Sequence, residues 1–202
     1  MHSYSSSTAE RQRVPRLIFA ASILLAGGIH AILSHYNFRL VWWVSFPSIG
    51  AFYAGLFFVF DRFMWKWKPL RAALQVKIPI LHGEWTGLVR PASGDKAETR
   101  PATLTIDQHW STINITLTTG RSESRSTMAS TGDERTSRPA LQYVYNNEPR
   151  ESAVETMHRH PGTARLTLEH RNGEEMLVGG YYTGRDRGST GELEFRRAKR
   201  PG

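Results

Sequence analysis

The chain has 202 residues, no cysteine and a formal net charge of +8. Without cysteine it can form neither disulfides nor thiolate metal sites. The positive charge does not indicate binding to a DNA or RNA duplex, because residues 1–77 carry nine Lys and Arg and two acidic residues, whereas residues 78–202 carry 17 and 16. We therefore interpret the basic residues of the first part as determinants of membrane topology and as contacts to anionic lipids in the bilayer.

Two long apolar runs follow the N-terminal residues. No charged residue occurs between Leu17 and Leu33 or between Leu40 and Phe60, and a membrane-spanning helix needs about 20 apolar residues. A cleaved signal peptide would account for the first run but not for a second run directly after it. A pair of buried soluble helices is disfavoured because aromatic residues lie all round the second run. The sequence predicts an antiparallel transmembrane hairpin over residues 17–60, with helices at 17–34 and 40–60.

Basic residues flank this hairpin at its two outer ends. Three Arg lie in the Ser-rich N-terminal tail, residues 1–16, whose first ten residues are expected to be disordered. Five Lys and Arg lie in a short stalk, residues 61–79, whereas the connection between the helices carries only Arg39. By the positive-inside rule, both termini are expected in the cytoplasm.

Beyond the stalk, the spacing of apolar residues changes from helical to alternating. Eight short segments, the first beginning at Gly83 and the last containing Phe195, each place apolar or aromatic residues on one face. Antiparallel strands joined by turns such as Asn172-Gly173 indicate a sandwich or a barrel, and closure into a barrel removes exposed edges. We expect a membrane-anchored all-β protein, in which the two-helix hairpin precedes a compact eight-stranded antiparallel β-barrel over residues 80–198.

The expected inner face of this barrel is polar as well as apolar. Three serines and three tyrosines share the face of the leucines: Ser122, Ser124, Ser126, Tyr143, Tyr145 and Tyr181. A purely structural core would use Val, Leu and Ile, because each buried hydroxyl requires a partner. We therefore expect a pocket that holds one small ligand. The alternative, in which the serines lie on a solvated edge strand, stays open.

Several short motifs follow the hairpin along the chain, in this order: His82-Gly83-Glu84-Trp85-Thr86-Gly87, Ile106-Asp107-Gln108-His109-Trp110, Leu141-Gln142-Tyr143-Val144-Tyr145-Asn146, Gly179-Gly180-Tyr181-Tyr182-Thr183, and Arg187 before Gly191-Glu192-Leu193. Together with the hairpin, this order resembles the β-barrel membrane effectors of CBASS, which are associated with the CD-NTase cyclases of bacterial anti-phage immunity. The resemblance covers residues 17–197.

The resemblance implies a function for each half of the chain. The barrel would bind a cyclic dinucleotide made by a partner CD-NTase, and binding would drive self-association of the transmembrane hairpins in the bacterial inner membrane. Loss of membrane integrity would then kill the infected cell. The protein would be a receptor and effector without a catalytic step of its own and without a cofactor.

A cyclic dinucleotide needs flat faces for its bases and donors for its phosphodiesters. The aromatic candidates are Trp110, Tyr143, Tyr145 and Tyr181, and the cationic candidates are Arg185 and Arg187. The polar candidates, for reading a base edge or lining the pocket, are Asn146 and Ser124.

Other functions have weaker support in the sequence. His158 and His160 have no nearby set of carboxylates, so no metal site is expected. No nucleophile and base arrangement or phosphate-binding glycine loop is recognisable, so no enzyme is expected. A membrane-tethered lipocalin-like carrier, or a structural anchor with a filled barrel, stays open as an alternative.

Overall fold

The structure is a computed structural model, and it describes residues 1–6, 9–36, 42–92, 98–132, 139–154, 158–185 and 188–198, without the side chains of 42–48. The chain divides into two compact units. One unit is Thr8–Lys77, and the other combines Met1–Ser7 with Ile78–Gly202. The second unit therefore contains residues from both sides of the first unit in the sequence.

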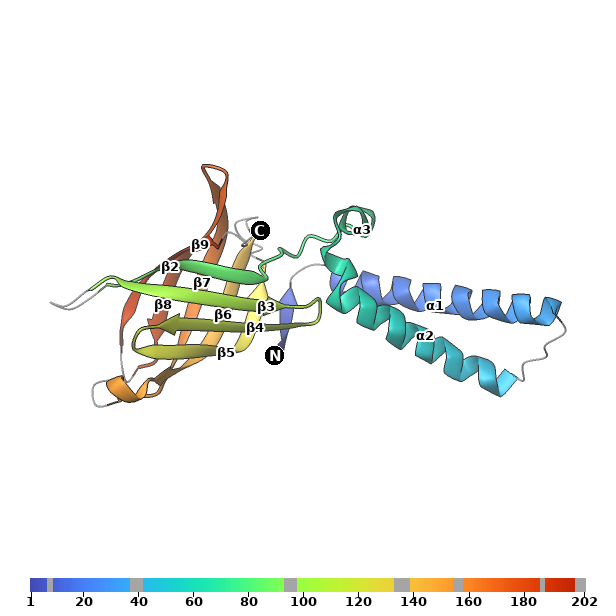
Figure 1. Cartoon of the computed structure of the whole chain (residues 1–202), viewed down its shortest axis with the longest axis horizontal. Coiled ribbons are helices and arrows are strands. Elements are labelled where there is room, and N and C mark those ends of the chain that lie inside the picture. Colours follow the sequence, from blue (N-terminus) through green and yellow to red (C-terminus); the bar gives the residue numbers. More distant parts are fainter. Residues whose placement is uncertain are drawn as a thin grey trace. The chain divides into compact units, whose positions relative to one another are not determined.

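The first unit is helical. It consists of α1 (Glu10–His35), α2 (Trp42–Arg62), a short 3-10 helix η1 (Met64–Lys66) and α3 (Lys68–Ala73) (Figure 1). By length and composition, α1 can cross a membrane. Its 26 residues span about 39 Å at ~1.5 Å per residue, more than the ~30 Å of a hydrocarbon core. The helix begins before the predicted span because the Arg residues of the tail are good helix formers, so charge ends the apolar run but not the helix.

Two hydrogen bonds hold the first turn of α1 against the end of the stalk. The Glu10 carboxylate accepts a bond from the backbone N–H of Lys77 at 2.8 Å, and Arg13 donates to the side-chain carbonyl of Gln75 at 2.8 Å. The chain therefore enters and leaves the helical unit at neighbouring positions.

The second unit is a closed barrel of nine strands among the described residues. The strands are β1 (His2–Ser6), β2 (Gly83–Pro91), β3 (Arg100–Gln108), β4 (Thr112–Thr119), β5 (Ser122–Thr131), β6 (Ala140–Pro149), β7 (His160–Arg171), β8 (Glu174–Thr183) and β9 (Thr190–Arg197) (Figure 1). Their order round the barrel is β1-β4-β3-β2-β9-β8-β7-β6-β5. The barrel architecture is confirmed, and the strand number is corrected from eight to nine.

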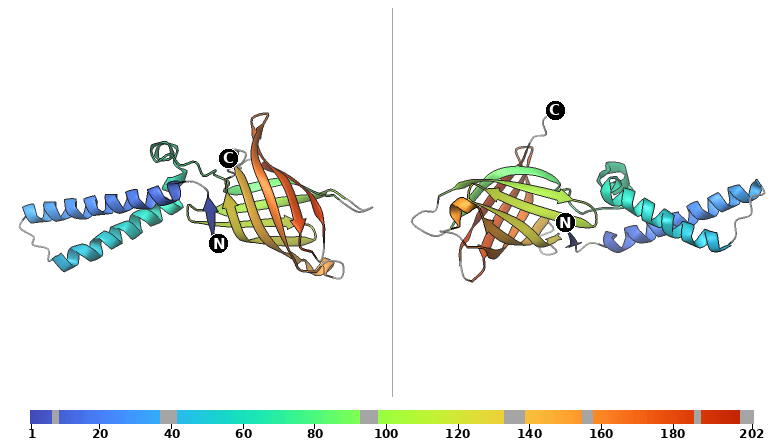
Figure 2. Two further views of the ribbon diagram at one scale, coloured as in Figure 1. Left: turned by 180° about the vertical axis from the view of Figure 1, so that it is seen from behind. Right: turned by 60° about the horizontal axis from the view of Figure 1, so that its bottom comes forward.

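The additional strand is β1, which lies in the tail that was expected to be disordered. Its first residues pair antiparallel with β4 and its last residues pair parallel with β5 (Figure 2). Direct pairing of β4 with β5 is limited to Thr116–Thr118 against Glu123–Arg125, so β1 fills the gap where these two strands diverge. The sequence did not reveal this strand because it offers one large buried residue, Tyr4, and is separated from the other strands by the hairpin.

One end of the barrel is filled by large side chains, and we call it the closed end. Trp85 and Phe195 are fully buried, and the Trp85 indole donates to the carbonyl of Leu81 at 2.9 Å. The Arg197 guanidinium lies over the Trp85 ring at 4.2 Å and donates to the carbonyl of His82 at 2.8 Å. The segment that enters β2 is thereby fixed across this end.

Gly179 in β8 lies where two strands approach very closely. A Cβ atom at this position would lie 1.9 Å from the carbonyl oxygen of Arg165 on β7, so the backbone would have to move. We expect Gly179→Ala to lower the free energy of unfolding by about 3 kcal/mol or more. Thermal unfolding of the detergent-solubilised chain measures this, with Gly120→Ala as the control, because a Cβ at Gly120 meets nothing within 4 Å. Equal midpoints for the two variants would contradict the expectation.

Candidate ligand-binding site

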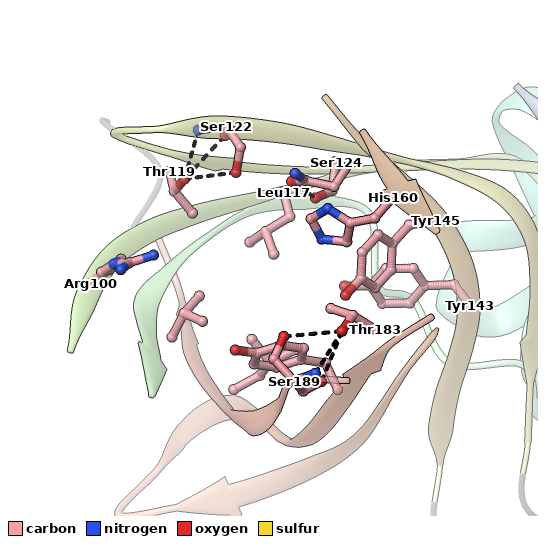
Figure 3. A pocket seen from close by; sticks show the side chains of 14 residues that line it. Arg100, Leu117, Thr119, Ser122, Ser124, Tyr143, Tyr145, His160, Thr183 and Ser189 are labelled. Carbon is pink, nitrogen blue, oxygen red and sulfur yellow. Dashed lines mark hydrogen bonds between the residues drawn. The ribbon is translucent and has the colours of Figure 1, made fainter. Parts of the chain in front are cut away.

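A cavity of about 80 Å³ lies inside the barrel at the end opposite the closed end. Strand β2 runs from Trp85 at the closed end to Val89 at the cavity, and β3 begins at the cavity with Arg100. The inner faces of strands β2 to β9 contribute to its wall, either directly or through their turns (Figure 3). The predicted interior pocket is therefore present, at one end of the barrel only.

Two of the cavity tyrosines lie over glycines of the neighbouring strand. Tyr145 of β6 is the register partner of Gly162 in β7, and Tyr181 of β8 is the register partner of Gly191 in β9. A Cβ atom would lie 2.4 Å from the Tyr145 ring if built on Gly162, and 2.5 Å from the Tyr181 ring if built on Gly191. Only glycine therefore lets each ring lie against the next strand, which keeps the centre of the cavity open.

Tyr143 presents a buried hydroxyl without a partner. Its side chain is 2 % exposed, and no hydrogen bond to its hydroxyl is found among the described residues. Burial raises the pKa of this phenol above its ordinary value, so the group stays a neutral donor. Its ring centroid lies 5.9 Å from that of Tyr145, and both hydroxyls point into the cavity (Figure 3). Because a buried donor without a partner is costly, this hydroxyl is suited to a ligand or a bound water.

The smaller hydroxyls of the wall are mostly satisfied within the protein. Ser124 donates to the side-chain carbonyl of Asn147 at 2.9 Å. Thr183 and Ser189 share bonds of 2.9 to 3.1 Å across the turn between β8 and β9, and Thr119 makes similar bonds across the turn between β4 and β5 (Figure 3). These residues fix the shape of the mouth of the cavity.

The serines of β5 face the barrel interior. Ser122, Ser124 and Ser126 are at most 8 % exposed. The alternative of a solvated edge strand is therefore wrong, because β5 pairs with β6 along its whole length and with β4 and β1 on its other side.

The charge of the cavity is favourable to an anion. Arg100 and His160 line it, and no carboxylate does so among the residues that the structure describes. The Nδ1 atom of His160 lies 2.8 Å from the carbonyl oxygen of His158, which can only accept, so Nδ1 carries the proton. Nε2 is then the atom that accepts a bond or, once protonated, donates one to a phosphate.

Four of the predicted site residues are brought together at the cavity. Tyr143, Tyr145, Tyr181 and Ser124 all line it. Sequence analysis did not name the other lining residues as site candidates, among them Arg100, His160 and Asn147. The alternation of β6 contained the signal for the last of these, because a residue two positions after Tyr145 faces the same side.

The other predicted site residues are placed elsewhere. Trp110 is buried at the closed end, in the turn between β3 and β4. Asn146 does not line the cavity, because it alternates with the inward residues Tyr145 and Asn147. Arg185 is exposed in the turn between β8 and β9 and is not a lining residue. Arg187 lies outside the described residues.

The candidate site combines aromatic faces, a buried hydroxyl without a partner among the described residues and two groups that can carry positive charge. It suits a ligand that combines flat rings with negative charge. Within the described parts of the chain, no group of three or more His, Cys, Asp or Glu is placed to hold a metal ion.

Comparison with known proteins gives concordant findings for the two units. Residues 76–197 match the family model described as the Cap15 cyclic dinucleotide receptor domain, and residues 12–66 match the model described as the Cap15 TM helices. A similar curated protein is CD-NTase-associated protein 15 of Staphylococcus schleiferi. It is 29 % identical over 140 residues, which cover 69 % of this chain and 71 % of the relative.

Proposed function

Because the chain belongs to the Cap15 family, whose models match its barrel and its helices, we propose that it is a membrane effector of CBASS immunity. In this proposal the barrel binds a cyclic dinucleotide that a CD-NTase produces after infection. Binding drives association of the α1–α2 hairpins, and the assembled hairpins disrupt the bacterial inner membrane and kill the cell. The protein acts by binding and assembly and not by catalysis.

The observation that carries the proposal is the chemistry of the cavity. Tyr145 and Tyr181 offer aromatic faces for a base, and the Tyr143 hydroxyl offers a donor to a base edge or a phosphate oxygen. The cavity is smaller than the ~300–1,000 Å³ of a typical small-molecule site. We therefore propose that one base enters the barrel, while the phosphodiesters stay near Arg100 and His160 at the wall of the cavity.

A lipid carrier and a filled structural barrel fit the cavity less well. A carrier for an apolar molecule has no use for a buried tyrosine hydroxyl without a partner beside Arg100 and His160. A filled barrel would place larger side chains than Gly162 and Gly191 against the tyrosine rings.

The barrel connectivity supports a hairpin that crosses the membrane twice. β1 precedes α1 and β2 follows α2, yet both strands belong to one barrel, so the chain leaves and returns on the same side of the membrane. If α1 crosses the bilayer, α2 has to cross back. The Lys and Arg at the outer ends of the hairpin support a cytoplasmic position for that side, by the positive-inside rule.

This topology can be tested by cysteine labelling, because the chain has no cysteine of its own. We expect Arg39→Cys, in the connection between the helices, to react with a membrane-impermeant maleimide at the periplasmic surface of spheroplasts. Gln142→Cys, exposed on β6, should react only after lysis. Labelling of Gln142→Cys in intact spheroplasts would contradict a cytoplasmic barrel.

The ligand can be tested by calorimetric titration of the full chain in nanodiscs with a panel of cyclic dinucleotides. We expect saturable binding of at least one of them, with one ligand per barrel. Linear dinucleotides and mononucleotides serve as controls of the same chemistry. Absence of binding by the whole panel to a folded chain would refute the proposed function.

A further inference from the structure

Strand β1 is the part of the barrel that lies next to α1 in the sequence. It ends at Ser6, and α1 begins at Glu10, so three residues join them. The four steps from Ser6 to Glu10 reach at most about 14 Å when fully extended. A displacement of β1 beyond this reach would have to move the start of α1.

The inner face of β5 connects the cavity to β1. Ser124 lines the cavity, and Ser126 is the next inward residue of the same strand. The Ser126 hydroxyl lies 2.8 Å from Nε2 of His2 on β1, and it also accepts a bond from the backbone N–H of Ile115 on β4 at 2.9 Å. A shift of β5 at the cavity would therefore change the contact that holds the start of β1.

A fully buried glutamine at the end of β3 makes hydrogen bonds both to β1, which precedes the helical unit in the sequence, and to the segment that follows this unit and leads into β2. The Gln108 side chain accepts a bond from the N–H of Leu81 at 2.7 Å and donates to the carbonyl of Pro79 at 3.0 Å, both at the entry to β2. It also donates to the Tyr4 hydroxyl at 3.3 Å, and Tyr4 in turn donates to the carbonyl of His109 at 3.2 Å. One side chain thus links β1 to the segment that follows the stalk.

β1 can leave its place without opening the cavity. Its backbone is in register with β4 at two positions and with β5 at three. The direct pairing of β4 with β5 lies on the cavity side, at Thr116–Thr118 against Glu123–Arg125, and does not involve β1. The barrel would therefore stay closed round the ligand while its other end loses one short strand.

From these contacts we propose that β1 is a releasable strand through which the barrel controls α1. Ligand in the cavity favours a position of β5 in which the contacts of β1 with Ser126 and Gln108 are broken. Release of β1 frees the start of α1 for association with other copies of the chain. The inference rests on the proposed function, because it assumes that a cyclic dinucleotide in the cavity triggers assembly.

Linkage gives the proposal a quantitative form. If the ligand favours the released state, then holding β1 in place has to weaken ligand binding by the same coupling factor. Conversely, removing a contact that holds β1 in place has to strengthen ligand binding. Tyr4→Phe removes the hydroxyl that bonds Gln108 and His109 and keeps the buried ring, so this variant is expected to bind ligand more tightly than the unaltered chain.

The test is a reversible disulfide between β1 and β4. Ser3 and Thr112 are register partners in antiparallel strands and face away from the core. Such partners are about 4.5–5.5 Å apart at Cα, within the ~4.4–6.8 Å that a disulfide requires. The variant is Ser3→Cys/Thr112→Cys. The control is Thr105→Cys/Thr116→Cys, a register pair that joins β3 to β4 and leaves β1 free.

The variants are reconstituted as full chains in dye-loaded liposomes that contain phosphatidylglycerol. The probe is the cyclic dinucleotide of the panel that binds the unaltered chain most tightly. We expect the oxidised β1 variant to bind it about 5- to 150-fold more weakly and to release no dye even at saturating probe. Reduction should restore both properties, and the control should release dye in both redox states.

Dye release by the oxidised β1 variant at saturating probe would overturn the role of β1 while leaving the proposed function intact. Equal affinity of the oxidised and reduced forms would overturn it as well, because no coupling would exist. Failure of the unaltered chain to bind any cyclic dinucleotide would overturn the proposed function and this inference together.

Discussion

Tyr145→Ala is expected to lower the affinity for the cyclic dinucleotide about tenfold or more. The ring of Tyr145 lines the cavity and lies over Gly162, where it can stack on a base. Loss of one base–aromatic stack costs ~1–3 kcal/mol. Calorimetric titration of the full chain in nanodiscs measures the change. Tyr182→Ala is the matched control, because Tyr182 follows Tyr181 on the same strand but is 58 % exposed and does not line the cavity.

Gly162→Ala tests the role of the Tyr145 ring in a second way, by displacing the ring and not removing it. A Cβ at residue 162 would lie 2.4 Å from the Tyr145 ring, so the ring has to move toward the cavity. We expect affinity to fall although every tyrosine is kept. In the Gly162→Ala/Tyr145→Ala variant there is no ring to displace, so the glycine substitution should add little to the loss caused by Tyr145→Ala. Additive losses in this cycle would show that Gly162 acts through another group.

Gly50→Leu and Gly55→Leu are expected to abolish permeabilisation of the membrane without changing ligand affinity. Both glycines lie on α2, and a Cβ at either meets nothing within 4 Å in the same chain. Both positions are exposed, so we expect a larger side chain to be accommodated within one hairpin. It would obstruct the close approach of helices from different chains, which small residues permit in membranes.

Uptake of an impermeant dye by cells that produce the cyclic dinucleotide measures this effect, and calorimetry on the purified chains measures affinity. Gly50→Ala and Val59→Leu are the controls, since the first adds only a methyl group and the second adds one methylene to an exposed apolar residue on the same helix. Full dye uptake in the Gly50→Leu and Gly55→Leu variants would show that assembly does not use these positions. Reduced ligand affinity in either would contradict the separation of binding from assembly.

Alternation in the sequence predicted the barrel because β2 to β9 each bury one face, and period-two patterns identify such strands directly. It placed Tyr143, Tyr145, Tyr181 and Ser124 correctly on the inner face. Strict use of the alternation would also have pointed to Asn147, because Asn146 lies between the two inward residues Tyr145 and Asn147.

Other parts of the site could not be derived from one sequence. Arg100 and His160 are the first residues of their strands. At such a position no preceding strand residue indicates whether the side chain faces inward or outward. Trp110 shares the barrel core with the tyrosines, but which end of a barrel is filled depends on the whole set of facing residues. β1 was not predicted because the strands with which it pairs are more than 100 residues away in the sequence.

The position of β1 in the chain has a consequence for the order of events during synthesis. β1 is the first part of the barrel to leave the ribosome, whereas β9 is completed at Arg197. At ~5–20 residues per second, β1 waits roughly 10–40 s for the rest of the barrel. In the proposed topology the hairpin emerges and inserts during that time, so the membrane segments are in place before the barrel is complete. In the proposed mechanism, a ribosome that stops early leaves a hairpin without the barrel that would restrain it, and only complete translation yields a chain that can respond to ligand.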